Sequence, residues 1–482
     1  MRILHLTSEL ASLVKVGGLG DALFGITRAQ TLEGHDVTAI LPYYQNIKTE
    51  SLEQFKLLEH DLWFAFDQAR FGARVWEGYL GQVRILLLEL LHPHQFFQRP
   101  NVYGYEDDPA RFLAFSSTAL AWLCQKPHYD ILHLHDWPSA ATSVLKTHFQ
   151  IQIPTLLTLH NVEHQAPASA AVLQRADLDS SMGNSLLEIG IHFANGISAV
   201  SKTYLDEIQT PEGGRSLDGL LRQKLAQSPC AGIVNGIDED YWDPTSSLVS
   251  VPYHYPLSFK SGQSQCESKR ANKHKLQEEL ALEVCDAPLV VCVTRLVPQK
   301  GLDLIEHALY RTLEKGGQFA LLGTSPIDSV QSHFQRLAQH LQHSTKARIL
   351  LTYSEKLALN FFAAGDLVLI PSLFEPCGLT QLIGFRFGAL AIARETGGLK
   401  DTVIDLEHHP KASSEGNGFT FLHPDFKGIG YAVDRALAAW HHPSKWNKWV
   451  ERVSKLDVSW KIPSQSYNKL YKEIIRSATH FS

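Results

Sequence analysis

Short aliphatic runs alternate with segments of helical periodicity along almost the whole chain. The runs are rich in Val, Ile and Leu and lack the apolar–polar alternation of a strand with one face in water. Strands buried on both faces and separated by helices predict parallel sheets covered by helices. The expected strands are RILHLTS, DVTAILP, DILHLHD, TLLTLH and GISAVS, followed by LVVCVTR, FALLG, RILLTY, DLVLIPS, LAIAR and GFTF.

This pattern is interrupted once, between about residues 241 and 287. The sequence there becomes polar and rich in Pro and Ser before a helical segment, ANKHKLQEELAL. Two doubly wound α/β domains joined near residue 243 explain this organisation. Because open parallel sheets bind ligands at the carboxyl ends of their strands, we expect the two domains to face each other across a deep cleft that holds the ligand.

Composition narrows the class of protein. The 482 residues carry a formal charge of −6 without a basic stripe, so we expect no nucleic-acid partner. The six cysteines form no C-x-x-C pair and are typical of reduced cytosolic thiols. The N-terminus lacks a signal-peptide profile, and no apolar stretch reaches the about 20 residues that span a bilayer. We therefore expect a cytoplasmic protein without membrane contact, and the oligomeric state is unknown.

A glycine-rich stretch, KVGGLGDALFG, follows the first expected strand and opens a helix. Gly17 and Gly18 have no side chains, so their backbone N–H groups can approach an anion. The helix N-terminus adds about half a positive charge, and Lys15 adds a full one. The stretch contains no G-x-G-x-x-G fingerprint, and taken alone it favours a tight turn beside a solvated lysine.

Two cations follow the first strand of the second domain, in VTRLVPQKGLD. Arg295 can hold phosphate oxygens through two parallel hydrogen bonds, and Lys300 supplies a point charge. This pair suits a diphosphate leaving group, although two solvated surface cations would give the same pattern.

A third candidate lies in LFEPCGLTQ, between an expected strand and a helix. Glu375 is there either a catalytic carboxylate or an N-terminal helix cap. Gly378 would let backbone amides face a ligand, and Cys377 is either reactive or buried. A glycine pair, Gly397 and Gly398, follows a neighbouring strand, and two such turns suit a nucleotide diphosphate.

Polar residues also follow two strands of the first domain, in HLHDWPSA and TLHNVEH. His133 and His135 do not complete a metal-ligand set, so we expect no metal there. A sugar pocket is the preferred interpretation, because sugar hydroxyls need paired donors and acceptors near an aromatic face. The acid-x-acid stretches at 177–179 and 238–240 are interpreted as solvated loops.

Taken together, these motifs resemble the glycogen and starch synthases of bacteria and plastids, a retaining glycosyltransferase family (family 5) with the two-domain GT-B fold. The motifs KVGGLGD, HLHDW, TLHN, VNGIDEDYWDP, TRLVPQKGLD, FEPCGLTQL and TGGLKDTV occur in the family's order. The resemblance implies a Rossmann-like acceptor domain over residues 1–243 and a nucleotide-sugar domain over 244–457. It also implies a C-terminal helix over 458–482 that packs back on the first domain.

The resemblance further implies the roles of individual residues. The implied catalytic residues are Glu375, His160, Arg295, Lys300 and Asp136. The implied substrate-binding residues are Lys15, Gly17, Gly18, Asp21, Asn235, Tyr353, Cys377, Gly378, Leu379 and Thr380. Among these, Lys15 and the glycines would meet the glucosyl phosphate, Asn235 would line the sugar site with Asp136, and Tyr353 would stack on the base.

The implied activity is glucose transfer from a nucleotide-glucose to the non-reducing 4-OH of an α-1,4-glucan such as glycogen or a maltooligosaccharide, with the anomeric configuration retained. ADP-glucose is favoured over UDP-glucose, and neither a cofactor nor a metal is expected. Three departures from the family pattern lie at HNVEHQA, at Glu188 and at Phe387. They keep two alternatives open: a catalytically weak glucan-binding or regulatory paralogue, and a UDP-glucose-using GT-B transferase.

Overall fold

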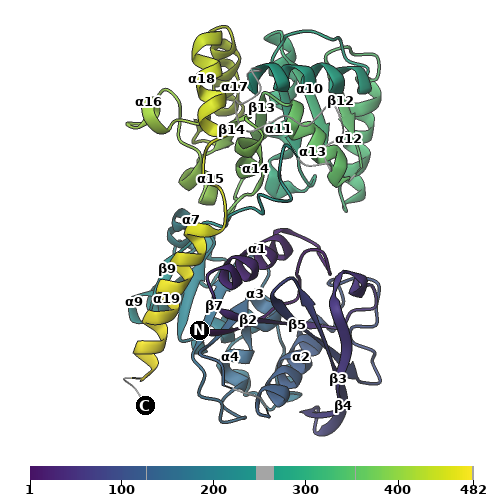
Figure 1. The fold of residues 1–482 in the computed structure, drawn as a ribbon, viewed down its shortest axis with the longest axis vertical. Helices are drawn as coiled ribbons and strands as arrows, with labels where there is room; N and C mark the ends of the chain where they lie inside the picture. The colour runs from purple at the N-terminus through teal and green to yellow at the C-terminus, as the bar shows by residue number, and fades with distance from the viewer. Residues whose placement is uncertain (126–127, 246–264, 353, 480–482) are drawn as a thin grey trace. The chain divides into compact units, whose positions relative to one another are not determined.

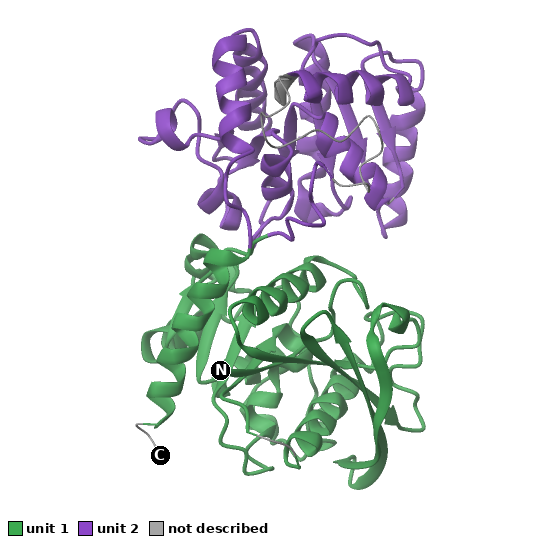
Figure 2. Ribbon diagram, in the orientation of Figure 1, with its two compact units in different colours: residues 1–236, 460–482 green, residues 237–459 purple. Residues whose placement is uncertain are grey.

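The computed structural model describes residues 1–125, 128–245, 265–352 and 354–479. The chain divides into two compact units, one of residues 1–236 with 460–482 and one of residues 237–459 (Figure 2). Each unit contains one sheet with helices packed on it (Figure 1). Over the described ranges, no helix is both long and apolar enough to cross a membrane.

The first unit is built on a nine-stranded sheet with the order β3-β4-β5-β2-β1-β6-β7-β8-β9. Neighbouring strands from β5 to β9 in this order are parallel, so the expectation of a parallel, doubly wound sheet is confirmed. The strands are β1 (Arg2–Leu6), β2 (Asp36–Pro42), β3 (Glu53–Phe66), β4 (Ala69–Leu80), β5 (Val83–Leu91), β6 (Ile131–His135), β7 (Thr155–Leu159), β8 (Gly196–Ala199) and β9 (Cys230–Gly232).

The sequence did not predict strands β3, β4 and β5, which extend one edge of this sheet as an antiparallel meander. Asp67 and Gln68 join β3 to β4 with φ values of 54° and 58°, the left-handed geometry of a two-residue hairpin turn. Buried and exposed residues alternate along much of β3, and Trp63 is exposed. A search for continuous aliphatic runs therefore passes over it.

The helices of the first unit include the C-terminal helix α19 (Lys461–Thr479), which packs against α1 (Gly18–Leu32). Ser464 on α19 donates to Glu33 at 3.1 Å, and Gln30 on α1 donates to the hydroxyl of Tyr471 at 2.9 Å. The remaining helices are α2 (Asp108–Leu123), α3 (Asp136–Ala140), α4 (Thr142–Leu145), α5 (Ala170–Gln174), α6 (Leu186–Phe193), α7 (Lys202–Glu207), α8 (Pro211–Gly214) and α9 (Asp218–Gln227).

The second unit contains a six-stranded sheet with the order β12-β11-β10-β13-β14-β15, parallel throughout. Its strands are β10 (Leu289–Val293), β11 (Gln318–Leu322), β12 (Ala347–Leu350), β13 (Leu367–Ile370), β14 (Leu390–Arg394) and β15 (Gly418–Phe421). Its helices are α10 (Gln265–Glu279), α11 (Leu302–Glu314), α12 (Asp328–His340), α13 (Glu355–Ala364), α14 (Thr380–Arg386), α15 (Gly397–Thr402), α16 (Ala412–Glu415), α17 (Phe426–Trp440) and α18 (Pro443–Val453). All six strands predicted for this half are present.

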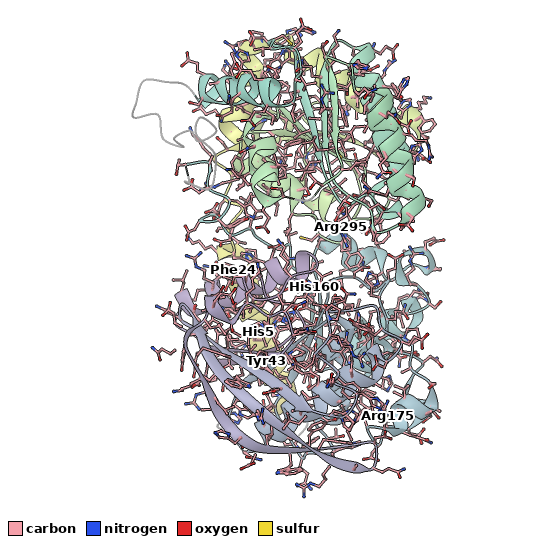
Figure 3. All side chains as sticks on the ribbon, turned by 90° about the vertical axis from the view of Figure 1, so that its right-hand side faces the viewer. His5, Phe24, Tyr43, His160, Arg175 and Arg295 are labelled. Atoms are coloured by element: carbon pink, nitrogen blue, oxygen red, sulfur yellow. The ribbon has the colours of Figure 1, made fainter. Side chains whose placement is uncertain are left out.

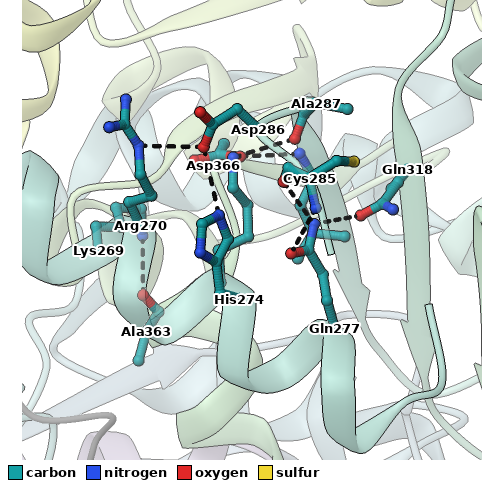
Figure 4. Close-up of polar contacts among 12 residues, drawn as sticks. Lys269, Arg270, His274, Gln277, Cys285, Asp286, Ala287, Gln318, Ala363 and Asp366 are labelled. Atoms are coloured by element: carbon teal, nitrogen blue, oxygen red, sulfur yellow. Dashed lines mark hydrogen bonds and ion pairs between the residues drawn. The ribbon is translucent and has the colours of Figure 1, made fainter. Parts of the chain in front are cut away.

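Buried polar side chains attach α10 to the rest of the second unit (Figure 4). Lys269 donates to the carbonyl oxygen of Phe387 at 2.8 Å, and Lys273 forms an ion pair with Asp366 at 3.0 Å. The ammonium group of Lys273 also lies 4.3 Å from the centre of the Trp440 ring. The helix that follows the polar interruption is therefore an integral part of this unit.

Candidate functional site

The glycine-rich loop of the first unit is held by an acid that the sequence interpretation missed. The carboxylate of Glu9, three residues after the end of β1, accepts the backbone N–H groups of Val16 at 2.6 Å and Gly17 at 2.9 Å. Its other oxygen accepts the hydroxyl of Tyr103 at 2.8 Å. Glu9 therefore uses the amide of Gly17 that we expected to face an anion. The signal for this role was an acid placed between the first strand and the glycines.

The outer side of this loop is nonetheless open. A Cβ atom built on Gly17 would meet no other atom within 4 Å, whereas one on Gly20 would lie 3.3 Å from the backbone of Ala11. Lys15 forms an ion pair with Asp21, in the first turn of α1, at 2.8 Å. Both side chains remain about 30% exposed, at 29% and 30%. A cation, the start of a helix and free space thus occur together here.

Asp136 organises the loop after the neighbouring strand β7. It follows β6 with a φ of 53°, a left-handed conformation that aspartate adopts more readily than most residues. One carboxylate oxygen accepts the backbone N–H of His160 at 2.6 Å and of Asn161 at 3.3 Å. Burial raises the pKa of Asp136 to about 7, and the negative charge of Glu9 acts in the same direction.

Two other predicted residues of the first unit lie close to strand ends. His160, labelled in Figure 3, follows β7, and its Nε2 atom lies 3.1 Å from Nδ1 of His135. Burial lowers the pKa of His160 to about 3, which makes it a neutral imidazole at physiological pH. Asn235 is buried in the segment that follows β9.

In the second unit the structure brings Lys300 and Glu375 together. The ammonium group of Lys300 lies 2.6 Å from Oε2 of Glu375, and the hydroxyl of Ser372 donates to the same oxygen at 2.7 Å. Glu375 is not a helix cap, because α14 begins at Thr380 with Leu379 at its N-cap position. The helix-cap interpretation is therefore wrong, and the catalytic role of this carboxylate stays a prediction.

The glycine pair at the start of α15 supports the turn that carries Glu375. Cβ atoms on Gly397 and Gly398 would lie 2.0 Å from the carbonyl oxygens of Glu375 and Cys377, respectively. The N–H of Gly398 donates to the carbonyl oxygen of Glu375 at 3.0 Å. This amide binds protein rather than an anion, and the pair lets two backbone segments approach closely.

The other predicted residues of the second unit surround the same strand ends. Lys300 and Thr380 line a small pocket at the carboxyl ends of β10 and β13. Arg295, labelled in Figure 3, is exposed after β10, and within the described ranges its guanidinium makes no hydrogen bond or ion pair. Gly378 has a φ of 74°, and Cys377 is buried. Tyr353 lies outside the described residues.

Glu188, one of the departures from the family pattern, has a structural role. Ser185 at the N-cap of α6 accepts the N–H of Glu188 at 3.1 Å, and Glu188 accepts the N–H of Asn184 at 2.7 Å. These two bonds stabilise the start of the helix, as in a capping box.

Comparison with known proteins identifies both halves of the chain. Residues 2–223 match the family model of the starch synthase catalytic domain, and residues 277–452 match that of glycosyl transferases group 1. A glycogen synthase of Protochlamydia amoebophila is 38% identical over 98% of this chain and 99% of that protein. A probable starch synthase 4 of Arabidopsis thaliana is also 38% identical, over 99% of this chain but 47% of that protein.

Solved structures agree with this match. The catalytic domain of starch synthase IV from Arabidopsis thaliana, bound to ADP and acarbose, is 36% identical, with a TM-score of 0.90. The match covers 98% of this chain and 99% of that one. A sucrose-phosphate synthase from Thermosynechococcus elongatus, 17% identical with a TM-score of 0.59 over 99% of both chains, shares the fold.

Proposed function

This chain belongs to the glycogen and starch synthase family of glycosyltransferases, and we propose that it transfers glucose from ADP-glucose to the non-reducing 4-OH of an α-1,4-glucan with retention. The observation that carries this proposal is its full-length similarity to a starch synthase catalytic domain bound to ADP and acarbose. Glycogen or a maltooligosaccharide is the proposed acceptor, the cytoplasm the proposed location, and no metal or cofactor is required.

The proposed chemistry begins with the charges that develop as the anomeric bond breaks. Negative charge grows on the diphosphate, and positive charge grows on the sugar ring. Arg295 and Lys300 would stabilise the diphosphate, with further contacts from Thr380 and the amides of Gly378 and Leu379. Removing one preorganised donor of this kind commonly costs about 3 kcal/mol of transition-state stabilisation.

Glu375 is the proposed partner of the sugar ring, with Cys377 beside it. Its Oε2 atom is already engaged by Lys300 and Ser372, which fixes the plane of the carboxylate. Within the part of the chain that the structure describes, its other oxygen accepts no hydrogen bond, and this oxygen would act on the positive charge of the reacting carbon. Tyr353 would stack on the base of the nucleotide.

Residues of the first unit would bind the sugar and its phosphate. Lys15, oriented by Asp21, and the loop at Gly17 and Gly18 would meet the glucosyl phosphate. The open space beside Gly17 supports this role. The sugar hydroxyls would bind Asp136, His160 and Asn235, which supply both acceptors and donors.

Initial rates with ADP-glucose and UDP-glucose, on glycogen and on short maltooligosaccharides, test the proposal. We expect faster release of ADP than of UDP, with products lengthened one glucose at a time. Lys300→Ala should weaken nucleotide-sugar binding and also slow transfer, whereas the exposed control Lys346→Ala should do neither. If the purified protein binds glycogen but releases no nucleotide from either donor, the proposed activity is wrong.

A further inference from the structure

A continuous chain of hydrogen bonds links His160 to the interior of the first unit. Nε2 of His160 lies 3.1 Å from Nδ1 of His135, and Nε2 of His135 lies 3.0 Å from Nδ1 of His5. Nε2 of His5 then lies 2.8 Å from the side-chain oxygen of Gln30 on α1. His5 lies in β1, His135 ends β6 and His160 directly follows β7; these three strands are neighbours in the sheet, and Figure 3 labels His5 and His160.

The buried imidazoles of this row of hydrogen bonds, His5 and His135, are neutral. His5, His135 and Gln30 are almost completely buried. Burial lowers the pKa of His5 to about 4 and that of His135 well below its ordinary value. A neutral imidazole carries one N–H donor and one acceptor nitrogen. In a row of neutral imidazoles all hydrogen bonds must therefore point the same way, and the group at the end decides the direction.

Gln30 is that end group. Its NH₂ group donates to the hydroxyl of Tyr471 at 2.9 Å, which leaves its carbonyl oxygen facing His5. A carbonyl oxygen accepts, so His5 carries its proton on Nε2 and presents Nδ1 to His135 as an acceptor. His135 and then His160 follow in the same sense, each protonated on Nε2.

The row of hydrogen bonds ends at His160 on the side opposite Gln30. His160 keeps some solvent exposure, whereas His5 and His135 have almost none. Its backbone is held by Asp136. Within the described ranges its Nδ1 atom has no hydrogen-bond partner. We propose that Gln30, His5 and His135 are positioning residues that fix His160 as the Nε2–H tautomer, so that its Nδ1 atom accepts a hydrogen bond from a hydroxyl of the bound sugar. The sugar in this statement rests on the proposed function, whereas the tautomer does not.

A metal site is the competing explanation for so many buried histidines. One ring nitrogen from each of His5, His133 and His135 lies within 4.8 Å of the others. However, every ring nitrogen of the three already has a hydrogen-bond partner. His133, for example, pairs with the hydroxyls of Tyr471 at 2.7 Å and Thr158 at 2.6 Å. A bound ion would have to break several of these bonds, so the hydrogen-bonded relay is favoured.

The direct test is the protonation pattern of His160 in ¹⁵N-histidine-labelled protein, because protonated and unprotonated ring nitrogens have well-separated chemical shifts. The chain has 24 histidines, so the His160 signals are identified by their loss in His160→Asn. Gln30→Met removes the terminal acceptor without changing any histidine. Thr158→Val is the matched control, since it removes a buried hydrogen bond on the side branch through His133 and leaves the relay intact.

We expect a single Nε2–H tautomer of His160 in the parent and in Thr158→Val, and a mixture of tautomers in Gln30→Met. In Gln30→Met kcat should fall about tenfold, the value of one hydrogen bond, with unchanged affinity for ADP. His5→Phe, which interrupts the relay at its second member, should behave in the same way.

Three results would overturn the relay: an Nδ1–H tautomer in the parent, the same tautomer in Gln30→Met as in the parent, or a stoichiometric metal lost in His5→Phe. Absence of transferase activity in a parent with the expected tautomer would instead refute the proposed function alone.

Discussion

Glu375 binds both Lys300 and Ser372 through one oxygen, Oε2, at 2.6 and 2.7 Å. Within the described ranges Oε1 accepts no hydrogen bond from the protein. The lysine thus fixes the orientation of the carboxylate and leaves one oxygen available for chemistry. A purely structural ion pair would gain from using both oxygens, so this arrangement favours a functional carboxylate.

Removing the negative charge of Glu375 tests whether this carboxylate takes part in glucose transfer. Glu375→Gln keeps the size of the side chain but removes the negative charge that would stabilise the sugar ring. We expect glucose transfer to fall more than a hundredfold, or about 2.7 kcal/mol. The Kd for ADP should change less than tenfold, or about 1.4 kcal/mol. Glu415→Gln, at an exposed position of the same unit, is the control, and transfer at the parental rate in Glu375→Gln would refute the assignment.

Gly17→Ala separates ligand binding from folding. The new methyl group would meet no protein atom within 4 Å, and the backbone φ of −146° suits any residue. We expect the free energy of unfolding to change by no more than about 0.5 kcal/mol. The KM for the nucleotide-sugar should rise severalfold, because the methyl group would occupy space that we assign to the phosphate. Unchanged KM in a stably folded variant would place the phosphate elsewhere.

In contrast to Gly17→Ala, Gly398→Ala should lower the stability of the folded protein. Its methyl group would lie 2.0 Å from the carbonyl oxygen of Cys377, so the turn that carries Glu375 must shift. We expect a loss of about 1–3 kcal/mol in stability, typical of overpacking, together with slower transfer. Gly219→Ala is the control, since its nearest neighbour would be 3.9 Å away within α9. Calorimetry would show the difference, and an unchanged Tm for Gly398→Ala would contradict the close contact.

The buried ion pair of Lys273 and Asp366 should contribute strongly to the second unit. Asp366→Ala leaves an ammonium group buried without its carboxylate and also removes the acceptor of the Leu289 N–H. Breaking such a pair typically costs about 3–5 kcal/mol. The double variant Lys273→Met with Asp366→Leu should cost less than Asp366→Ala alone, because no charge remains buried. Urea unfolding of the three proteins measures this, and equal losses would argue against the ion pair.

The sequence predicted five strands of the first sheet, β1, β2, β6, β7 and β8, and all six of the second, because a strand covered on both faces has a continuous aliphatic signature. It did not predict β3 and β4, whose partly exposed faces interrupt that signature. It also missed β5, although this strand is mostly buried and aliphatic apart from Arg84 and Glu89. Lys300 and Glu375 were each selected from their own motif. Their contact could not be foreseen, because it depends on how two βα loops meet at the edge of the sheet. Whether the selected residues bind substrate stays a prediction.

Glu9 and the histidine relay show a second reason why parts of the site could not be predicted from the sequence. The sequence signal for Glu9 is only an acid between the first strand and the glycines, and its partners at Val16, Gly17 and Tyr103 are defined by the folded loops. The histidines are conspicuous in the sequence, but His5 and His135 lie in two separate strands and His160 follows a third. Only the strand order β1-β6-β7 reveals that they form one row.

The buried histidines His5, His133 and His135 predict how the free energy of unfolding depends on pH. The pKa of His5 is lowered to about 4 in the folded protein, whereas it is about 6.5 in the unfolded chain. Between these values the unfolded chain binds more protons, so the free energy of unfolding must fall as the pH falls from 6.5 to 4. For His5 alone the loss is about 3 kcal/mol, and His133 and His135 add to it because burial lowers their pKa values as well.

Asp136 acts in the opposite direction in a similar window. Its pKa is raised to about 7 from an ordinary value of 3.8, so between these values the folded protein binds the extra proton and stability falls as the pH rises. Urea unfolding at intervals between pH 4.5 and 8 measures the sum. His5→Phe should flatten the rise of stability with pH, Asp136→Asn should steepen it, and the exposed control His343→Gln should leave it unchanged. A flat profile below pH 6.5 in Asp136→Asn, which lacks the opposing contribution of the carboxyl group, would show that these histidines are not buried in the neutral form.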